Sequence, residues 1–362
     1  MPAGSGGQIA IFSTTSLYAD VTSAALSAAL WTNFVSESVE HKFDELVEGA
    51  ITGYKATPPS HQGADMANGD ISLEPNPNAI GMFLRGVFGQ SSGSLLTHAG
   101  SWGANSGGLL NLPPGYSARP VITHTFLPSQ SAYDPYTYLP PYGIFLYKDV
   151  GSAFVHTGAI FNTLNFQIQA GQLVKSTVGV MARNTTRHAR ITSVAALRNP
   201  GGQPWVWNAA SVQVGPGVSS LAAYTYFESI DVKYETPIEG VLLLDGTRKY
   251  GEMQVNGFQS VNISGTMAFR DQTEYDQFVS YTNRFLRLTL RNTNSSQIIG
   301  NPSSAYYFGL DIDIPQFKIL TWQTNISGPN RLTAQFTAKG EFDVTSLYNI
   351  EVRLINTTSA YI

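Results

Sequence analysis

The sequence predicts a mainly β protein made of two tandem β-sandwich domains, each with one flanking α-helix and long loops. Three observations support this prediction. A segment of thirteen residues recurs 191 residues later, because residues 37–49 resemble residues 228–240, with five positions identical and five more similar in chemistry. The 362 residues include 34 Gly, 19 Pro and many β-branched and aromatic residues, a composition typical of antiparallel strands joined by turns. One amphipathic helical pattern occurs in each half.

The repeat predicts where the domains lie, because both copies continue with the same order of elements. We expect copy one in residues 1–197, with a Gly/Ser/Pro-rich insertion at about 90–142, and copy two in residues 198–350. Residues 196–200 are the expected linker, and residues 351–362 form a C-terminal extension. Each copy is long enough to bury a core of its own.

The repeated segment itself reads as a strand with one buried and one wet face. Alternate residues of a strand point to opposite faces. In copy one the apolar face has Val39, Phe43 and Val47, and the polar face has Glu40, Lys42 and Asp44. In copy two the apolar face has Ile230 and Tyr234, and the polar face has Asp231, Lys233 and Glu235.

Downstream of this strand, copy one shows a long connection over residues 50–68 and a strand over residues 70–73. A helix follows, with Asn76 as its cap, Pro77 in the first turn and Gly89 as its end. Its apolar positions are Ile80, Phe83, Leu84 and Val87, at helical spacing. Two strands around the turn at Gly171 complete the copy.

Copy two repeats this order with a connection over residues 241–258 and a strand over residues 261–264. Its helix has Tyr275, Phe278 and Val279 on the apolar side, and two strands flank a turn at Gly328. Connections of about 18 residues are far longer than ordinary hairpin loops, which predicts a function for them. The apolar run Val241-Leu242-Leu243-Leu244 would aggregate in water, so we expect it to be covered.

Composition excludes several classes of protein. Charged residues make up 13% of the chain, the net charge is −4 and there is no basic run, so general nucleic-acid binding is not expected. There is no Cys, which excludes disulfides, thiol catalysis and zinc-thiolate sites. The N-terminus shows no signal peptide and no apolar run approaches about 20 residues. We expect a soluble chain made in a cytoplasm, with no membrane insertion.

Motifs for catalysis or cofactors are nearly absent, so we predict no enzyme and no cofactor or metal. Residues 89–93 match G-x-S-x-G, but they follow a helix, whereas a nucleophile elbow follows a strand. The six His residues are scattered without metal-ligand spacing. Asp311 and Asp313 share a face of a strand, where acids facing water or a partner's Lys are the common explanation.

The order of elements resembles that of the tail tube, or major tail, proteins of long-tailed bacteriophages. The best local resemblances are residues 69–74 running into 78–82, residues 264–269 running into 274–276, and residues 312–317. Most members of that family have one tube domain and form hexameric rings. Some have two tandem domains and form trimeric rings that imitate hexamers, and this chain resembles that second kind.

The resemblance implies a structural virion protein that polymerises as stacked rings into the tail tube, a channel for genome delivery. The implied partners are further copies of the chain, the tape-measure and tail-end or terminator proteins, and double-stranded DNA that passes without specific binding. The implied location is the virion, with assembly in the host cytoplasm. The lining strands correspond to residues 34–48, 70–73, 162–169 and 173–182 in copy one, and 226–239, 261–264, 316–323 and 331–339 in copy two.

The same resemblance assigns roles to two sets of residues. The side chains expected to face a slightly acidic lumen are Glu40, Lys42, Asp44, Asp231, Lys233 and Glu235. The side chains expected on arms that contact an adjacent subunit or ring are Tyr54, Lys55, Pro58, Pro59, His61, Leu242, Leu243, Leu244, Arg248, Lys249 and Tyr250. For the insertion at 90–142, an outer decoration and an inter-ring contact both remain open.

Two other functions fit the composition. A carbohydrate-binding β-sandwich would use the 5 Trp and 18 Tyr as stacking platforms, and glycan binding by a monomer would favour it. A capsid or decoration protein would share the low charge and the long arms without needing a duplicated domain.

Overall fold

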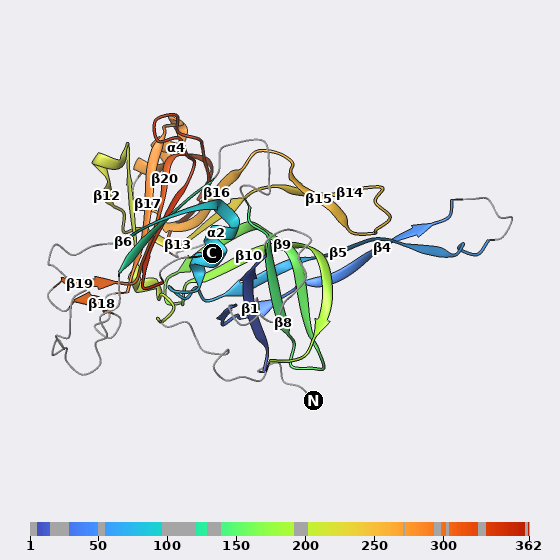
Figure 1. The fold of residues 1–362 in the computed structure, drawn as a ribbon. Helices are drawn as coiled ribbons and strands as arrows, with labels where there is room; N and C mark the ends of the chain where they lie inside the picture. Colours follow the sequence, from blue (N-terminus) through green and yellow to red (C-terminus); the bar gives the residue numbers. More distant parts are fainter. Residues whose placement is uncertain are drawn as a thin grey trace, which may run out of the picture.

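Figure 1 shows the computed structural model of the chain, which describes residues 6–14, 29–49, 55–95, 121–128, 139–191, 202–270, 272–292, 298–301, 304–324, 331–358 and 361. These residues form mainly antiparallel β-strands, as the sequence predicts. The expected linker at 196–200, Gly328 and most of the insertion lie outside the described residues.

Copy one contains a helix and ten described strands in chain order. They are β1 (Gln8–Ser13), β2 (Leu30–Thr32), β3 (Ser36–Glu37), β4 (Glu40–Val47), β5 (Ser60–Leu73), α2 (Ile80–Phe88), β6 (Gly89–Leu95), β7 (Ile122–Pro128), β8 (Tyr142–Tyr147), β9 (Ala153–Gln169) and β10 (Lys175–His188).

The chain after residue 202 contains a second helix and twelve described strands, of which the last lies in the expected C-terminal extension. Its elements are β11 (Ala210–Gly215), β12 (Ala222–Ala223), β13 (Phe227–Glu235), β14 (Ile238–Leu242), β15 (Tyr250–Val255), β16 (Ser260–Ala268), α4 (Thr273–Val279), β17 (Arg284–Arg291), β18 (Ile298–Asn301), β19 (Ser304–Tyr307), β20 (Gly309–Thr324), β21 (Thr333–Gly340) and β22 (Glu351–Asn356).

Eight strands lie side by side in one continuous sheet that runs through both copies. Their order is β4–β5–β10–β9 in copy one, followed by β13–β16–β21–β20 in copy two. The two halves join where β13 pairs with β9, with Tyr234 opposite Leu164 and Asp231 opposite Gln167. These strands include the segments that the sequence suggested as lining strands. The second half therefore extends the sheet of the first.

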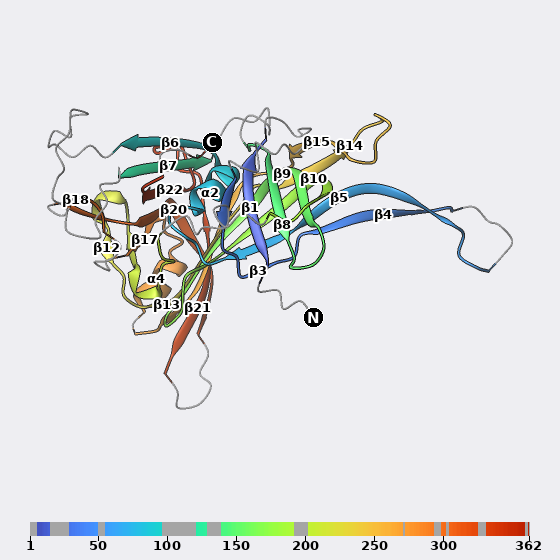
Figure 2. The same cartoon turned by 60° about the horizontal axis from the view of Figure 1, so that its bottom comes forward.

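A second layer of strands covers one face of this sheet in each copy (Figure 2). In copy one, β8 pairs with the first part of β9 and with β1. In copy two, β17 pairs with the first part of β20 and with β11, while β22 lies on the other side of β20. Strand β7 pairs with β22, and β6 pairs with β7. The ends of the copy-one insertion therefore extend the outer layer of copy two.

The main hydrophobic core is a cluster of buried residues that crosses the boundary between the copies. Alternate residues of β9 and β13, such as Phe166 and Val232, point into it and are 2% exposed. Helix α2 contributes Phe83 and Phe88, and the Phe88 ring lies 4.6 Å from the Tyr234 ring of copy two, measured between centroids. Side chains of both copies thus stabilise one interior.

The helices differ in part from the sequence prediction. Helix α2 ends before Gly89, whose φ of 78° suits glycine. The helix begins later than expected, so the Asn76 side chain accepts a hydrogen bond from the Asn78 amide at 3.0 Å in a preceding turn instead of capping. In α4, Phe278 is partly buried against the core, but Tyr275 and Val279 are 43% and 63% exposed. Helical spacing alone did not show that this face is uncovered.

The C-terminal residues pack against copy one. The Tyr361 hydroxyl donates to the Asn78 carbonyl at 3.1 Å, and the Asn356 amide donates to the Tyr361 hydroxyl at 2.5 Å. Nε2 of His124, on β7, lies 2.8 Å from the Thr358 carbonyl oxygen. These contacts connect the end of the chain to α2 and to the insertion.

Candidate functional site

The polar face of the eight-stranded sheet brings together the side chains that the sequence predicted for a lumen. Residues opposite each other in neighbouring strands point to the same side. Glu40 of β4 lies opposite Asn68 of β5, and Asn68 lies opposite Met181 of β10. Lys175 is six residues before Met181 in β10, so both side chains are on the same face. Lys175 lies opposite Gln167, which lies opposite Asp231. Glu40, Lys42 and Asp44 therefore share one face with Asp231, Lys233 and Glu235.

Several charges on this face are paired or hydrogen-bonded. Lys42 lies 3.5 Å from Glu40, and Lys233 lies 2.9 Å from Glu235. The Asp231 carboxylate accepts hydrogen bonds from Asn165 and Gln167 at 3.2 and 3.0 Å. Lys175 and Lys339 add exposed cations. The face thus mixes both signs of charge rather than being plainly acidic.

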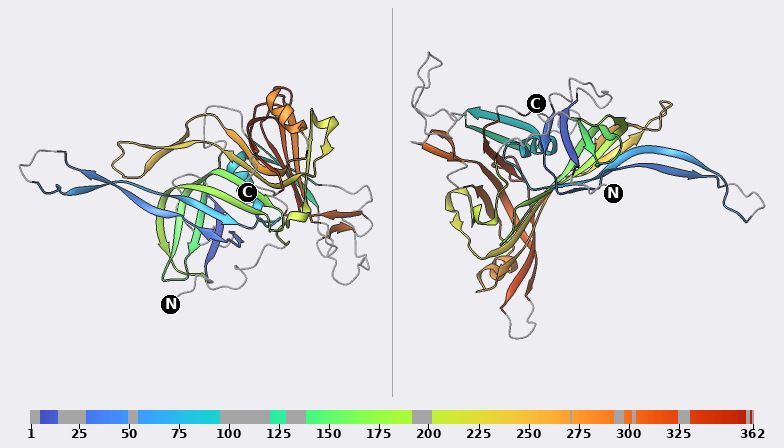
Figure 3. Two further views of the ribbon diagram at one scale, coloured as in Figure 1. Left: turned by 180° about the vertical axis from the view of Figure 1, so that it is seen from behind. Right: turned by 90° about the horizontal axis from the view of Figure 1, so that it is seen from below.

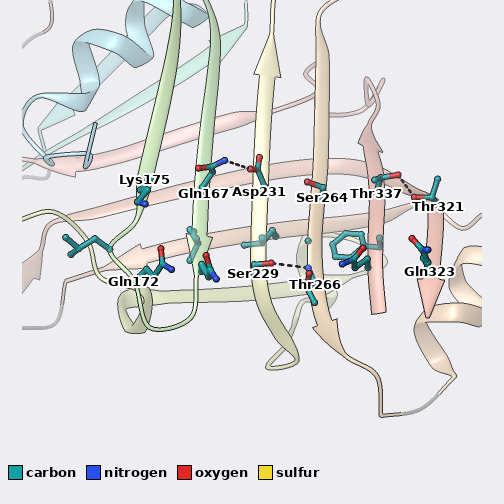
Figure 4. A pocket seen from close by; sticks show the side chains of 17 residues that line it. Gln167, Gln172, Lys175, Ser229, Asp231, Ser264, Thr266, Thr321, Gln323 and Thr337 are labelled. Atoms are coloured by element: carbon teal, nitrogen blue, oxygen red, sulfur yellow. Dashed lines mark hydrogen bonds between the residues drawn. The ribbon is translucent and has the colours of Figure 1, made fainter. Parts of the chain in front are cut away.

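A hollow of about 680 Å³ lies on this face where the two copies join (Figure 4). Its side chains are mostly uncharged and polar, with Gln167, Ser229, Ser264, Thr321 and Gln323 among them. A Thr321–Thr337 hydroxyl contact of 2.6 Å and a hydrogen bond from the Thr266 amide to Ser229 connect neighbouring strands across it. Such a surface offers many hydrogen-bonding groups but no concentrated charge.

The first predicted arm is a hairpin that projects from the body. Strand β4 and the first part of β5 extend far beyond the other strands (Figures 1 and 2). Lys55, Pro59 and His61 are exposed and Pro58 is half-buried, whereas Tyr54 lies outside the described residues. All eight residues of β4 are exposed.

This exposure corrects one expectation about β4. The alternation predicted a buried face with Val39, Phe43 and Val47. Val39 is buried at 2% exposure, but Phe43 and Val47 are 46% and 48% exposed. The pattern correctly groups these side chains on one face, but nothing in the described chain covers the outer part of that face.

The second predicted arm, β14–β15, folds back onto copy one of the same chain (Figure 3). Tyr250 and Met253 are buried with Leu139 and Ile160 of copy one. The Arg183 guanidinium donates to the Tyr250 carbonyl at 2.5 Å.

Polar contacts continue along the same arm. The Asp65 amide donates to the Arg248 carbonyl at 2.7 Å, and Lys249 donates to Asn184 at 2.5 Å. At the tip, Leu242, Leu243 and Leu244 are 53%, 43% and 109% exposed. Arg248, Lys249 and Tyr250 therefore contact the adjacent copy within one chain, and contact with another chain remains a prediction for the tip.

Sequence reasoning missed a charged cluster on the outer layer. Asp313 does not face water or a partner's Lys, because it is buried at 3% exposure. Arg287 donates two hydrogen bonds to its carboxylate at 2.7 Å each, and Arg353 donates a third at 2.8 Å. Asp311 pairs with Arg291 at 2.7 Å. Arg287 and Arg291, which are four residues apart and share a face of β17, were the signal that could have indicated such partners.

Among the described residues, no group of three or more His, Cys, Asp or Glu side chains could bind a metal ion. In that same part of the chain, no helix is long and apolar enough to cross a membrane.

Comparisons with known proteins give one family match over most of the chain. No curated protein matches the sequence significantly. Among solved structures, a chain from the tail of an empty gene transfer agent particle, refined with C6 symmetry, is 13% identical, with 42% of this chain and 97% of that chain covered and a TM-score of 0.26. A chain from the virion of a native gene transfer agent particle is 15% identical, with 36% of this chain and 90% of that chain covered and a TM-score of 0.24.

The sequence profile of the phage tail tube protein family matches residues 4–348. The chain therefore belongs to the phage tail tube protein family, whose members are structural proteins of the virion tail.

Proposed function

We propose that three chains close into a ring with pseudo-sixfold symmetry, and that stacked rings form a tail tube through which the genome passes. The observation that supports this proposal is the continuous eight-stranded sheet, in which copy two extends copy one through the β9–β13 pair. Each chain already contains one junction between equivalent domains. Repeating the same junction between chains would leave no free sheet edge.

The dimensions of such a ring are suitable for a channel. Three chains would supply 24 lining strands, because each has eight. At about 4.8 Å between strands and a tilt of about 40°, the closed barrel has a backbone diameter of about 48 Å. Side chains that extend about 5 Å inward, half the spacing of packed sheets, leave a channel of about 38 Å, wide enough for duplex DNA.

The part of the polar face that arm β14–β15 leaves uncovered would line this channel, because the opposite face forms the core. Glu40, Lys42 and Asp44 with Asp231, Lys233 and Glu235 would then meet the passing DNA. A wall of uncharged polar groups and balanced charges neutralises few phosphates, so DNA would not bind to it strongly. We propose a tape-measure protein and a tail terminator as further partners, and the host cytoplasm as the place of assembly.

Electron microscopy of the purified chain at high concentration tests the number of chains per ring. We expect class averages of rings with three chains and six similar lobes, and stacks of these rings as tubes. Rings of six chains, or a chain that stays monomeric at all concentrations, would overturn the proposal.

A further inference from the structure

Arm β14–β15 joins the body of the chain at a neck that Asn256 closes. The Asn256 backbone amide donates a hydrogen bond to the Pro237 carbonyl at 2.9 Å. Its side-chain Nδ2 donates a second hydrogen bond to the Glu239 carboxylate at 2.6 Å. Pro237 and Glu239 lie where the chain passes from β13 into the arm, and Asn256 lies where it leaves the arm towards β16. One residue therefore connects the two sides of the neck.

The residue that follows Asn256 is a glycine, and this pair has a specific chemistry. The backbone nitrogen of the residue after an asparagine can attack the side-chain carbonyl carbon of that asparagine. Glycine favours this attack because it has no Cβ to obstruct the approach and it adopts many backbone conformations. The sequence contains two such pairs, Asn68–Gly69 and Asn256–Gly257.

The second pair lies in an accessible part of the structure. Asn256 and Gly257 are both exposed, in the connection between β15 and β16. Within the described residues, no hydrogen bond uses the Gly257 amide, so this nitrogen is available for the attack. The hydrogen bond to Glu239 uses Nδ2 of Asn256 and not the carbon that would be attacked.

The first pair lies inside strand β5. Asn68 is opposite Glu40 on one side and Met181 on the other, and Gly69 is opposite Val180. A backbone that is held by strands on both sides can rearrange only after the sheet opens locally. This pair is therefore an internal control for the exposed one.

We propose that Asn256 is a site of spontaneous deamidation, and that its conversion loosens arm β14–β15 from copy one. In the first step, the Gly257 nitrogen bonds to Cγ of Asn256 and the bond from Cγ to Nδ2 breaks. The proton lost by the Gly257 nitrogen leaves with Nδ2 as ammonia. Water then opens the resulting succinimide to aspartate or isoaspartate. The reaction needs only the single chain, so it is independent of the proposed ring.

Either product weakens the closure of the neck. An aspartate side chain has no N–H group, so the donor to Glu239 is lost and a second negative charge takes its place. Two negative charges this close repel each other, although the surrounding water weakens the effect. Isoaspartate also adds one carbon to the main chain, which displaces the backbone that bonds to Pro237.

The position of the arm makes this change measurable. Tyr250 and Met253 of β15 are buried with Leu139 and Ile160 of copy one. Opening of the neck frees the end of β15 that follows these two residues. Exchange of backbone amide hydrogens over residues 250–255 reports how often this segment opens.

Mass spectrometry of the full chain, after prolonged incubation at neutral pH and elevated temperature, tests the reaction. We expect the peptide with Asn256 to gain the mass difference between an amide and an acid, and isoaspartyl methyltransferase to label it. Conversion at Asn68 should be slower by at least about tenfold, because opening of the sheet limits it. Asn256→Gln is the matched control, since its longer side chain would have to form a larger ring, and it should convert far more slowly. Comparable conversion at Asn68 and Asn256, or no conversion at Asn256, would overturn the proposed site.

Amide hydrogen exchange tests the effect on the arm. Asn256→Asp reproduces the aspartate product at an exposed residue, so the variant should fold. We expect exchange over residues 250–255 to become about fivefold faster, because repulsion replaces a hydrogen bond to a charged group. Asn262→Asp adds the same charge at an exposed residue of β16 and should leave this exchange unchanged.

A double variant separates the repulsion from other effects of the substitution. Glu239→Gln combined with Asn256→Asp removes one of the two charges and supplies a new donor, so it should restore most of the slow exchange. Unchanged exchange in Asn256→Asp would overturn the role of the neck. The same increase with and without Glu239→Gln would also overturn it.

Discussion

Asp313 shows how one side chain organises the outer layer of copy two. Its carboxylate accepts hydrogen bonds from Arg287 and Arg353, on the two strands that flank β20. Hydrogen bonding to Asp313 is the largest cause that raises the pKa of Arg287 above its usual value. The strands β17, β20 and β22 are thus connected by charge as well as by their backbones.

We expect Asp313→Asn to destabilise the chain by about 3 kcal/mol, because a buried ion pair that loses one partner leaves charges without compensation. Denaturant unfolding at neutral pH would measure this loss. Glu48→Gln, at a side chain 52% exposed, is the control and should change the free energy of unfolding by less than about 0.5 kcal/mol. A similar small change for Asp313→Asn would mean that the cluster does not stabilise the fold.

A buried histidine predicts a loss of stability in mild acid. His156 is 1% exposed, and Nδ1 lies 2.9 Å from the Thr185 hydroxyl. Burial is the main cause that lowers its pKa to about 4, and the nearby Lys148 and His41 lower it further. The unfolded chain binds a proton at this site below about pH 6.5, whereas the folded chain does so only near pH 4.

This difference means that stability falls as the pH decreases from 6.5 to 4, by about 3 kcal/mol from His156 alone. We expect His156→Gln to remove that part of the pH dependence. Unfolding by denaturant at pH 7 and at pH 4.5 would compare the two chains. His61→Gln, at a side chain 68% exposed, should leave the pH dependence of the parent. An equal loss in the parent and in His156→Gln would contradict the role of His156.

These residues also show which features the sequence could predict. Alternation correctly placed Phe43 with Val39 and Asp311 with Asp313, because strand geometry fixes which side chains share a face. It could not predict that Phe43 is exposed or that Asp313 has arginine partners. Both depend on strands that are distant in sequence, such as β22, or on contacts outside the single chain.

At the scale of elements, the two arms diverge because of one proline. Pro237 separates β13 from β14, at the position that Leu46 occupies within the uninterrupted β4. A proline cannot donate to the strand ladder, so regular pairing stops there. Arm β14–β15 then folds onto copy one, while the β4–β5 hairpin continues outward (Figure 3).

The duplication predicted these elements well, but it could not predict all of their connections. Helix α2, helix α4 and the hairpins β9–β10 and β20–β21 follow local patterns of 3.6 and 2 residues. The pairing of β7 with β22 joins residues 122–126 to residues 352–356. No local pattern specifies a pair at that separation, so the role of the insertion ends became visible only in the fold.

The exposed tip of arm β14–β15 should act after ring closure. Leu242→Ser together with Leu244→Ser removes apolar surface but leaves the buried Tyr250 and Met253 in place. We expect single rings to form normally and their stacking into tubes to be reduced, as measured by tube length in electron micrographs. Val218→Ser, at a residue 59% exposed outside both arms, is the control. Tubes of parent length from the double variant would show that the tip makes no contact between rings.

At the scale of the whole molecule, each chain already contains one of the two junctions per chain that the proposed ring requires, and the other would form with a second copy. The internal β9–β13 junction fixes the angle between the copies before assembly, because the core is continuous across it. A ring of three such chains needs three new junctions rather than six. Such a ring would therefore need fewer contacts between chains than a ring of six single-domain chains.

The charge of the proposed channel wall provides the last prediction. In the parent chain, this face combines Glu40, Asp44, Asp231 and Glu235 with interspersed lysines. The acids offset the positive charge of the lysines, so the phosphates of DNA would bind weakly. Replacement of these four acids by Lys changes the charge of each chain by +8, from −4 to +4. Every ring of three chains would then present many cations to the passing DNA.

We expect tubes of this variant to assemble, because the four side chains point away from the core, but to slow genome passage. Each phosphate neutralised by a cation makes binding depend on salt with a slope of about −0.9. Tubes should therefore retain duplex DNA at low salt and release it as the salt concentration increases, which a filter-binding assay over a salt series would measure. Replacement of the same acids by Gln is the matched control, since it removes the negative charges without adding cations and should bind far less DNA. If the Lys variant retains no more DNA than the parent, or if virions that contain it deliver DNA at the normal rate, this face does not line the channel.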